Sequence, residues 1–382
     1  MNRPGQRRSV TPGGLSCWGS GGAERAFSVF RNRRLSSRSG GPDRSLLALG
    51  GLVALVLVGG RAAEPAYALA PSPGCGHTSP GQSYTATVPV DGTQRTALVV
   101  VPPQAKPGVP LPLLVMFHGA HSSGPATASS TGLAQAASAA GFISVYPDAN
   151  GSYWARPEAD DRNQNDMVFV GRLMAQLDSA LCVDDSRVYG AGGSNGAGFL
   201  TRVACSLGAR FTAIAPVAGV YRPLAGCRPP HPISVLEIHG TNDHTAPYDS
   251  LNPMDPMGKI GVYSLLDAWF IWDQCPPGAP TWRRLGPRAL WLAKSGCAGG
   301  TTVAHIKLIG EPHAWPTAST SSHAIGVAFD ASQAIMQFFQ TGTVSFPQTV
   351  SPGHTHRGPS PRSPHNESGG GRAAPAATSR TG

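Results

Sequence analysis

The sequence has little charge, and the positive excess that it does have lies at its ends. Only 13% of its 382 residues are Asp, Glu, Lys or Arg. Residues 1–61 carry ten Arg and two acids, and residues 346–382 carry four Arg and one acid. The stretch 62–345 has 16 basic against 18 acidic residues, so it lacks the basic surface that binds a row of phosphates. The sequence therefore argues against a nucleic-acid partner.

No apolar run reaches the roughly 20 residues that a membrane span needs. The most apolar stretch, 46–58, follows an Arg-rich segment and precedes two A-x-A sites within 66–70. This order is typical of a secretory signal peptide, which we place at 1–70 with a long basic n-region. We expect a secreted, extracellular protein with no stable membrane association after cleavage. An uncleaved anchor helix is the alternative.

Motifs for metals and cofactors are also missing. No two cysteines have the C-x-x-C spacing of a zinc or redox site. Residues 161–165 begin like a calcium loop, but Asp166 occupies the glycine position and Arg172 the closing glutamate position. The glycine-rich run 190–198 has neither the G-x-G-x-x-G spacing nor a P-loop lysine. We expect no metal and no cofactor.

Cysteine usage agrees with export. Seven cysteines are present, and Cys17 falls in the predicted leader, which leaves an even number for disulfides. Six cysteines allow 15 connectivities. Proximity along the chain favours Cys205–Cys227 and Cys275–Cys297, which leaves Cys75–Cys182, and free buried thiols are the alternative.

Short apolar runs alternate with helix-length stretches between residues 71 and 345. Alternating strand-like residues occupy 83–101, and continuous apolar runs follow at 113–117, 142–146, 187–189, 211–217, 233–238 and 303–309. Helix-length stretches are 129–140, 166–181, 195–207, 259–274 and 322–340. Continuous apolar strands suit a sheet covered on both faces. We predict one α/β domain at 71–345 with a mostly parallel central sheet and helices on both faces. We expect the low-complexity tail 346–382 to be disordered.

The strongest local signal is Gly192-Gly193-Ser194-Asn195-Gly196, which fits G-x-S-x-G. The motif follows a short predicted strand and opens a predicted helix, which is the context of a nucleophile elbow. Gly192 and Gly196 would leave room for backbone to pass beside a strained serine. An ordinary glycine-rich turn is the alternative.

Two later motifs supply the partners that a nucleophilic serine needs. Asp243 ends His239-Gly-Thr-Asn-Asp243, directly after the strand 233–238, and His313 lies in a loop near the end of the next strand. A serine hydroxyl needs a base to take its proton, and that base needs a carboxylate to fix its tautomer. The order Ser…Asp…His is that of the α/β-hydrolase fold, which we predict. Packing for His313 and turn capping for Asp243 are the alternatives.

An oxyanion hole needs two backbone N–H donors. We assign one to Asn195, which follows the serine, and the other to Ala120, in the loop after the strand 113–117. We expect His118, which precedes that loop, to be structural. Trp315 and Tyr248 are candidates for the substrate pocket, with core packing as the alternative for both.

Several motifs together resemble those of the secreted poly(3-hydroxybutyrate) depolymerase and type C feruloyl esterase family. The resemblance spans about 74–340 and depends on His118-Gly119, 182–189, 193–198, 215–219, 239–243 with Pro247-Tyr248, and His313-Ala-Trp-Pro316. It implies an extracellular serine carboxylic-ester hydrolase with the triad Ser194, Asp243 and His313. This chain departs from the family at Glu311-Pro312, where a glycine-rich run is usual, and in the segment 277–300.

We therefore expect an esterase that forms an acyl-enzyme and acts on a polyester or on a feruloylated polysaccharide fragment. We expect the protein to be a monomer. An acyltransferase on the same scaffold and a non-catalytic binding protein with a hydrolase fold are the alternatives, because fold alone does not fix function.

Overall fold

The computed structural model describes residues 71–345, except for 77–78, 156–161, 223–225 and 250–258. The predicted signal peptide at 1–70, with Cys17, and the predicted tail at 346–382 lie outside the described residues. In the part of the chain that the structure describes, no helix combines the length and the hydrophobicity of a membrane span.

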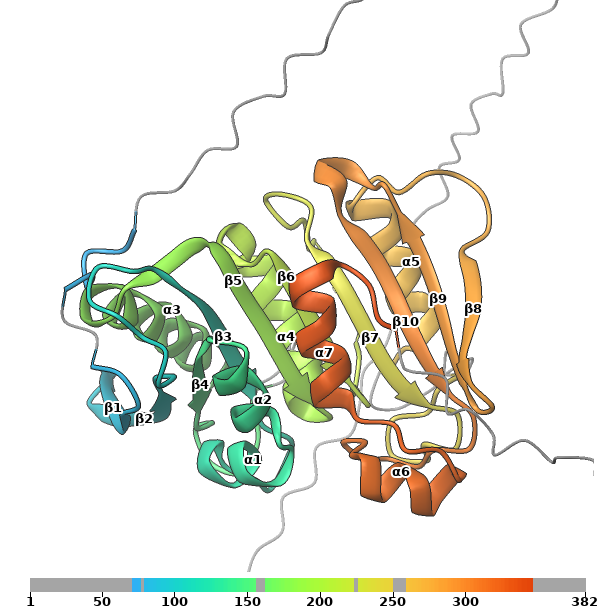
Figure 1. Ribbon diagram of the computed structural model, residues 1–382, viewed down its shortest axis with the longest axis horizontal. Helices are drawn as coiled ribbons and strands as arrows, with labels where there is room; N and C mark the ends of the chain where they lie inside the picture. Colours follow the sequence, from blue (N-terminus) through green and yellow to red (C-terminus); the bar gives the residue numbers. More distant parts are fainter. Residues whose placement is uncertain (1–70, 77–78, 156–161, 223–225, 250–258, 346–382) are drawn as a thin grey trace, which may run out of the picture. The chain divides into compact units, whose positions relative to one another are not determined.

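One ten-stranded sheet organises the described residues, in the order β1-β2-β4-β3-β5-β6-β7-β10-β9-β8 (Figure 1). From β4 to β10, neighbouring strands are parallel. These parallel strands are β4 (Ile143–Pro147), β3 (Leu111–Phe117), β5 (Val183–Gly193), β6 (Ala213–Val217), β7 (Ser234–Gly240) and β10 (Thr302–Leu308). Apart from the first half of β5, their side chains are almost all buried, because helices cover both faces.

An antiparallel hairpin extends the sheet at each end. On one side β1 (Ser83–Val90) pairs with β2 (Thr93–Val100), which pairs with β4. On the other side β9 (Ala289–Ser295) pairs with both β10 and β8 (Thr281–Gly286). This second hairpin occupies the segment 277–300, for which the sequence predicted no strand.

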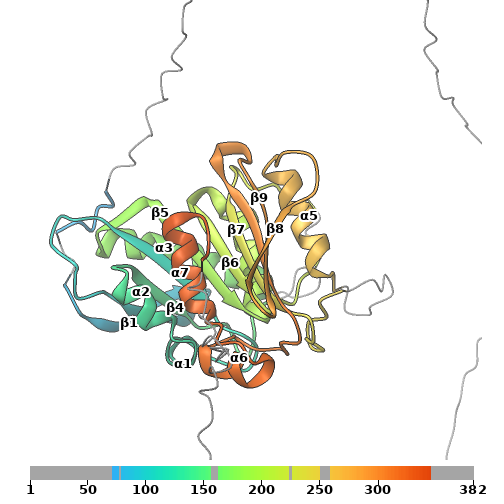
Figure 2. The same cartoon turned by 45° about the vertical axis from the view of Figure 1, so that its right-hand side comes forward.

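Helices cover the two faces of the sheet (Figure 2). The buried side chains form two separate apolar cores. One face carries α3 (Arg162–Ala180), α4 (Asn195–Ser206) and α5 (Val262–Trp272), which bury Phe169, Phe199 and Trp269. The other face carries α1 (Gly124–Ser130), α2 (Leu133–Ala139), α6 (Ala318–Ile325) and α7 (Ala331–Thr341). In Figure 1, α7 lies in front of the sheet and α4 lies behind it.

Two of the predicted helices are each broken into shorter elements. The predicted helix 129–140 is α1 followed by α2, because Gly132 adopts a left-handed φ of 72° between them. The predicted helix 322–340 is α6 followed by α7, and Gly326 ends α6 at a φ of 67°. Left-handed backbone at a helix end favours glycine, so each glycine marks a stop.

Three disulfides join the six cysteines of the described region. They are Cys75–Cys182, Cys205–Cys227 and Cys275–Cys297, the pairs that proximity along the chain favoured. The first ties the segment before β1 to the residue that precedes β5, across a sequence separation of 107 residues. The third ties the end of α5 to the segment before β10, and so closes the base of the β8–β9 hairpin.

Candidate active site

Ser194 occupies a strained turn between β5 and α4. Its backbone has φ 53° and ψ −118°, which a non-glycine residue rarely adopts. A β-carbon on Gly192 would lie 2.6 Å from the carbonyl oxygen of Gly196, and one on Gly196 would lie 2.3 Å from that of Phe117. Both glycines of the G-x-S-x-G motif are therefore required for the chain to turn this sharply, and the turn lifts Ser194 above the sheet edge.

Asp243 lies in the loop after β7, and that loop is joined to the one that carries His313. Thr241 N donates to the carbonyl of Leu308, Gly310 N donates to Thr241 Oγ1, and Asn242 N donates to the carbonyl of Glu311. A β-carbon on Gly240 would come within 2.1 Å of that same Glu311 carbonyl. The motif His239-Gly-Thr-Asn-Asp243 thus brings the His313 loop against the end of β7.

These loops place Ser194, His313 and Asp243 in one hydrogen-bonded row. His313 Nε2 lies 2.9 Å from Ser194 Oγ, and His313 Nδ1 lies 2.7 Å from Asp243 Oδ2. Asp243 is buried, whereas the His313 side chain remains 25% exposed. An imidazole between a hydroxyl and a carboxylate can take the hydroxyl proton through Nε2 while Nδ1–H donates to the carboxylate.

The Asp243 carboxylate is held as an anion by the donors around it. Burial opposes its charge, but hydrogen bonds from His239 and His313 hold its pKa well below the usual range. Its Oδ1 accepts hydrogen bonds from Thr245 N at 2.9 Å and from Ala246 N at 2.7 Å. The carboxylate therefore has one orientation, with Oδ2 towards His313.

The loop after β3 lies beside the serine. The backbone of Gly119 lies close enough that an added β-carbon would be 3.4 Å from Ser194 Cβ. His118 is buried, with Nδ1 2.7 Å from the carbonyl of Gly119 and Nε2 accepting from Ala149 N. Burial lowers the pKa of His118, and these contacts suit a neutral, structural imidazole. The predicted donors differ in exposure: Ala120 is exposed and Asn195 is half-buried.

A pocket of about 180 Å³ opens at Ser194 and His313. Trp315 contributes to its wall and donates from Nε1 to Ser332 Oγ at 3.1 Å. The rest of the wall combines apolar groups with hydroxyls: Met116, Gly119, Thr127, Ser130, Thr131, Gly193, Val217, Ala218 and Ala314. The reactive hydroxyl therefore faces a small cavity in which an acyl group can lie.

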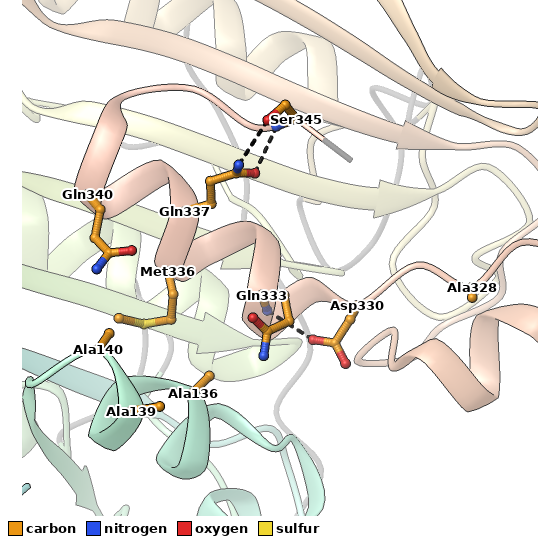
Figure 3. Close-up of a pocket in the computed structure, with 10 residues that line it drawn as sticks. All are labelled: Ala136, Ala139, Ala140, Ala328, Asp330, Gln333, Met336, Gln337, Gln340 and Ser345. Carbon is orange, nitrogen blue, oxygen red and sulfur yellow. Dashed lines mark hydrogen bonds between the residues drawn. The ribbon is translucent and has the colours of Figure 1, made fainter. Parts of the chain in front are cut away.

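A larger hollow of about 560 Å³ lies away from this row, between α2 and α7 (Figure 3). Alanines of α2 and glutamines of α7 line it. Its carboxylate, Asp330, accepts from Gln333 N and so caps α7, while Gln337 is bonded to Ser345. Asp330 and Gln337 therefore hold α7 and the segment that follows it. Within the described residues, no group of three or more His, Cys, Asp or Glu side chains could hold a metal ion.

Comparison with known proteins places this site in an esterase. The chain is 30% identical over 310 residues to the "Putative esterase NocK" of Nocardia uniformis subsp. tsuyamanensis, which covers 70% of this chain and 89% of that protein. The chain belongs to the same esterase family as NocK. The esterase is also 34% identical over 108 residues to the "Probable feruloyl esterase C" of Aspergillus niger, where the match covers 28% of this chain and 37% of the fungal protein.

No family model matches the esterase. Among solved structures, acetyl xylan esterase from Aspergillus awamori superposes with a TM-score of 0.49 at 16% identity, covering 64% of this chain and 99% of that one. The parallel sheet, the turn at Ser194 and the relatives' names agree: this is a carboxylic ester hydrolase of the α/β-hydrolase fold.

Tyr248 does not line the pocket of the esterase, contrary to the sequence prediction. It is buried behind Asp243, where its hydroxyl lies 2.7 Å from His305 Nε2. Sequence reasoning also missed His239, Glu237 and His305 as neighbours of the site. A signal was present, because polar residues two apart interrupt apolar strands at 237 and 239 and at 305 and 307. Residues two apart on a strand share a face, so each pair indicates polar side chains on one face of its strand.

Proposed function

We propose that the esterase hydrolyses its substrate through an acyl-enzyme on Ser194. Ser194 Oγ attacks the ester carbonyl while His313 Nε2 accepts its proton, and the alcohol leaves with that proton. Water, deprotonated by His313, then attacks the acyl-serine and releases the acid. The observation that carries this proposal is the hydrogen-bonded row of Ser194, His313 and Asp243, with contacts of 2.9 and 2.7 Å.

We assign the backbone N–H groups of Asn195 and Ala120 to the oxyanion. Asn195 N is the first amide of α4, where the N-terminal N–H groups have no partner within the helix. The Asn195 side chain is bonded to the Trp154 backbone, accepting from its N–H at 2.7 Å and donating to its carbonyl at 3.2 Å. This pair of bonds supports the turn, because it joins the start of α4 to the loop after β4.

The pocket favours esters of small or flat acids that carry hydroxyl groups. Met116, Val217 and Trp315 offer an apolar surface, and Thr127, Ser130 and Thr131 offer hydroxyls. A hydroxylated aromatic acid has both kinds of surface, and relatives of this chain are named feruloyl esterases. We therefore propose hydroxycinnamoyl esters, released from a soluble polysaccharide fragment, as the substrate class.

The disulfides support an extracellular location for the esterase. Disulfides persist in oxidising compartments, and the three disulfides of the described region agree with the secretory leader that the sequence predicts. We propose that the catalytic unit lies within 71–345 and acts outside the cell as a monomer.

A fluorophosphonate probe and a small p-nitrophenyl ester test the mechanism. We expect the wild-type chain to be labelled and to turn over the ester, and Ser194→Ala to lose both while remaining folded. Ser179→Ala, which changes an exposed serine on α3 outside the pocket lining, is the matched control. Turnover or labelling that survives Ser194→Ala contradicts the assignment. Methyl ferulate, an acetyl ester and 3-hydroxybutyrate oligomers, compared by kcat/KM, then test the substrate class.

A further inference from the structure

A row of buried polar side chains continues behind Asp243, away from the pocket. His239 Nε2 lies 3.2 Å from Asp243 Oδ2, the same oxygen that His313 approaches. His239 Nδ1 lies 2.9 Å from Glu237 Oε1. His239 and Glu237 come from β7 and are 1% and 0% exposed. The mechanism proposed above uses neither residue, although burying such groups is costly unless they are paired.

The partners of His239 fix its protonation. Nδ1 faces a carboxylate oxygen, and Nε2 faces the carbonyl of Ala246 at 2.8 Å as well as the Asp243 carboxylate. Carbonyls and carboxylates only accept hydrogen bonds, so both ring nitrogens must donate. A neutral imidazole has one N–H, whereas an imidazolium has two. The contacts therefore call for a charged His239.

Glu237 is in turn surrounded by donors, which identifies it as the anion of the pair. Tyr221 Oη donates to Glu237 Oε1 at 2.8 Å, and His305 Nδ1 lies 2.5 Å from Glu237 Oε2. The other nitrogen of His305 lies 2.7 Å from the hydroxyl of Tyr248, which in turn lies 3.2 Å from the hydroxyl of Tyr263.

We propose that His239 is a positioning residue of the esterase: held as an imidazolium by Glu237, it fixes the Asp243 carboxylate towards His313 and sets the pH at which His313 becomes a base. This inference rests on the proposed roles of Asp243 and His313. The charge of His239 reaches His313 through a single shared oxygen, Asp243 Oδ2. A cation at that distance weakens the hold of Asp243 on a proton at His313, so it keeps the base free at lower pH.

The electrostatics of the cluster agree with this geometry. Burial opposes the charge of His239, but Glu237 and Asp243 raise its pKa to about 10. Burial likewise opposes the charge of Glu237, but His305 and His239 lower its pKa to about 2. The other groups that face the cluster are Tyr221, Tyr248, Tyr263 on α5 and, from β10, Lys307, whose Nζ lies 4.7 Å from the centre of the Tyr248 ring.

Two matched substitutions separate positioning from simple packing. His239→Gln and His305→Gln each remove a buried imidazole that contacts Glu237, but only His239 contacts Asp243. We expect His239→Gln to move the acidic limb of the kcat/KM–pH profile up by about one pH unit and to lower kcat about tenfold. We expect His305→Gln to leave that limb in place. A loss of folded protein lowers kcat/KM equally at every pH. The acidic limb of the kcat/KM–pH profile moves only if the charge of His239 acts on His313.

An acidic limb that stays in place in folded His239→Gln overturns the proposal, and so does an equal shift in both variants. If His239→Gln does not fold, Glu237→Gln provides the test: it removes the anion that keeps His239 charged and should move the limb in the same direction.

Nitrogen-15 NMR of the wild-type chain is independent of turnover. Two protonated nitrogens on His239 at pH 8 are expected, and a neutral ring there contradicts the proposal. By contrast, labelling that persists in Ser194→Ala contradicts the proposed function and leaves this NMR result unaffected.

Discussion

The two sides of Asp243 differ in almost every physical respect. On the pocket side lie Ser194 and His313, partly exposed and next to a cavity of about 180 Å³. On the sheet side lie His239 and Glu237, at most 1% exposed. In the mechanism proposed above, Ser194 and His313 pass a proton between them, whereas His239 and Glu237 keep their charges. Under that proposal, the groups that react need access to the pocket, and the groups that orient them need burial.

The largest expected effect comes from Asp243→Asn, which breaks the link between the two sides. Oδ1 accepts from two backbone amides, so the amide nitrogen of asparagine must take the place of Oδ2. It would then face Nδ1–H of His313, and the imidazole would have to adopt the other tautomer, with its hydrogen towards Ser194. We expect kcat for a p-nitrophenyl ester to fall about 10⁴-fold, as for the equivalent change in serine proteases.

Unfolding in urea provides the control for Asp243→Asn, because the variant must be folded when it is assayed. A folded variant that keeps more than a tenth of the wild-type kcat would show that Asp243 does not set the tautomer.

The next effect is on stability and concerns the sheet side alone. Glu237→Ala removes the anion from a buried ion pair and leaves His239 without its counter-charge. We expect the free energy of unfolding to fall by about 3–5 kcal/mol at pH 7. Tyr221→Phe, which removes only a hydroxyl that donates to Glu237, should cost about 1 kcal/mol. Equal losses of unfolding free energy in the two variants would contradict a charge pair between Glu237 and His239.

The pH dependence of the same variant follows from the pKa values. The pKa of Glu237 is lowered to about 2, so its stabilisation is present above its ordinary value and is lost as the pH falls towards 2. The pKa of His239 is raised to about 10, so its stabilisation is complete at mildly acidic pH and is lost as the pH rises through 10. The difference in the free energy of unfolding between wild type and Glu237→Ala should therefore be smaller near pH 2 and near pH 10 than at pH 7.

A smaller effect, on kcat/KM alone, is expected from a substitution in the pocket wall. Ser130 lines the pocket from the end of α1 and is exposed, so phenylalanine there narrows the cavity without changing the core. We expect Ser130→Phe to lower kcat/KM for methyl ferulate about tenfold and to change that for p-nitrophenyl acetate less than about twofold. Ser129→Phe, one residue away and outside the pocket lining, is the control. Equal losses with both esters would mean that the acyl group lies elsewhere.

The smallest effect concerns Asp273, a fully buried carboxylate that accepts hydrogen bonds from neutral groups. Burial raises its pKa to about 6, and it accepts from Ile233 N and Thr301 Oγ1. The folded chain therefore holds an extra proton there at moderately acidic pH, and stability falls as the pH rises through about 6. We expect Asp273→Asn to raise the free energy of unfolding by about 1 kcal/mol at pH 7.

At pH 4 the gain from Asp273→Asn should vanish, because aspartate is then already protonated in the fold. Asp267→Asn, an exposed carboxylate on α5, should change little at either pH. A gain of the same size at both pH values would contradict an electrostatic origin.

The parallel strands and the row of Ser194, Asp243 and His313 could be expected from sequence because each depends on local patterns. Buried parallel strands are continuous apolar runs, and both glycines beside Ser194 are required by the turn itself. The hairpin β8–β9 was missed because Thr281–Gly286 is mostly exposed and carries two arginines, so no apolar alternation indicates a strand.

The cluster behind Asp243 could not be predicted in detail, because it depends on strand register. Glu237 faces His305, and His239 faces Lys307, across the parallel pair β7 and β10. A shift of one residue would turn these side chains to the other face of the sheet. Tyr248 lies in the loop after β7 and not on a strand, so strand alternation could not indicate that it contacts His305.

One of the two edge strands, β8, has a consequence for solubility. An edge strand presents unpaired N–H and C=O groups, which another copy could extend into a continuous sheet. Arg283 and Arg284 are both exposed on this rim, so two rims that approach each other bring like charges together. These two arginines disrupt the apolar alternation that would have predicted β8, and their charge also opposes edge-to-edge pairing between copies.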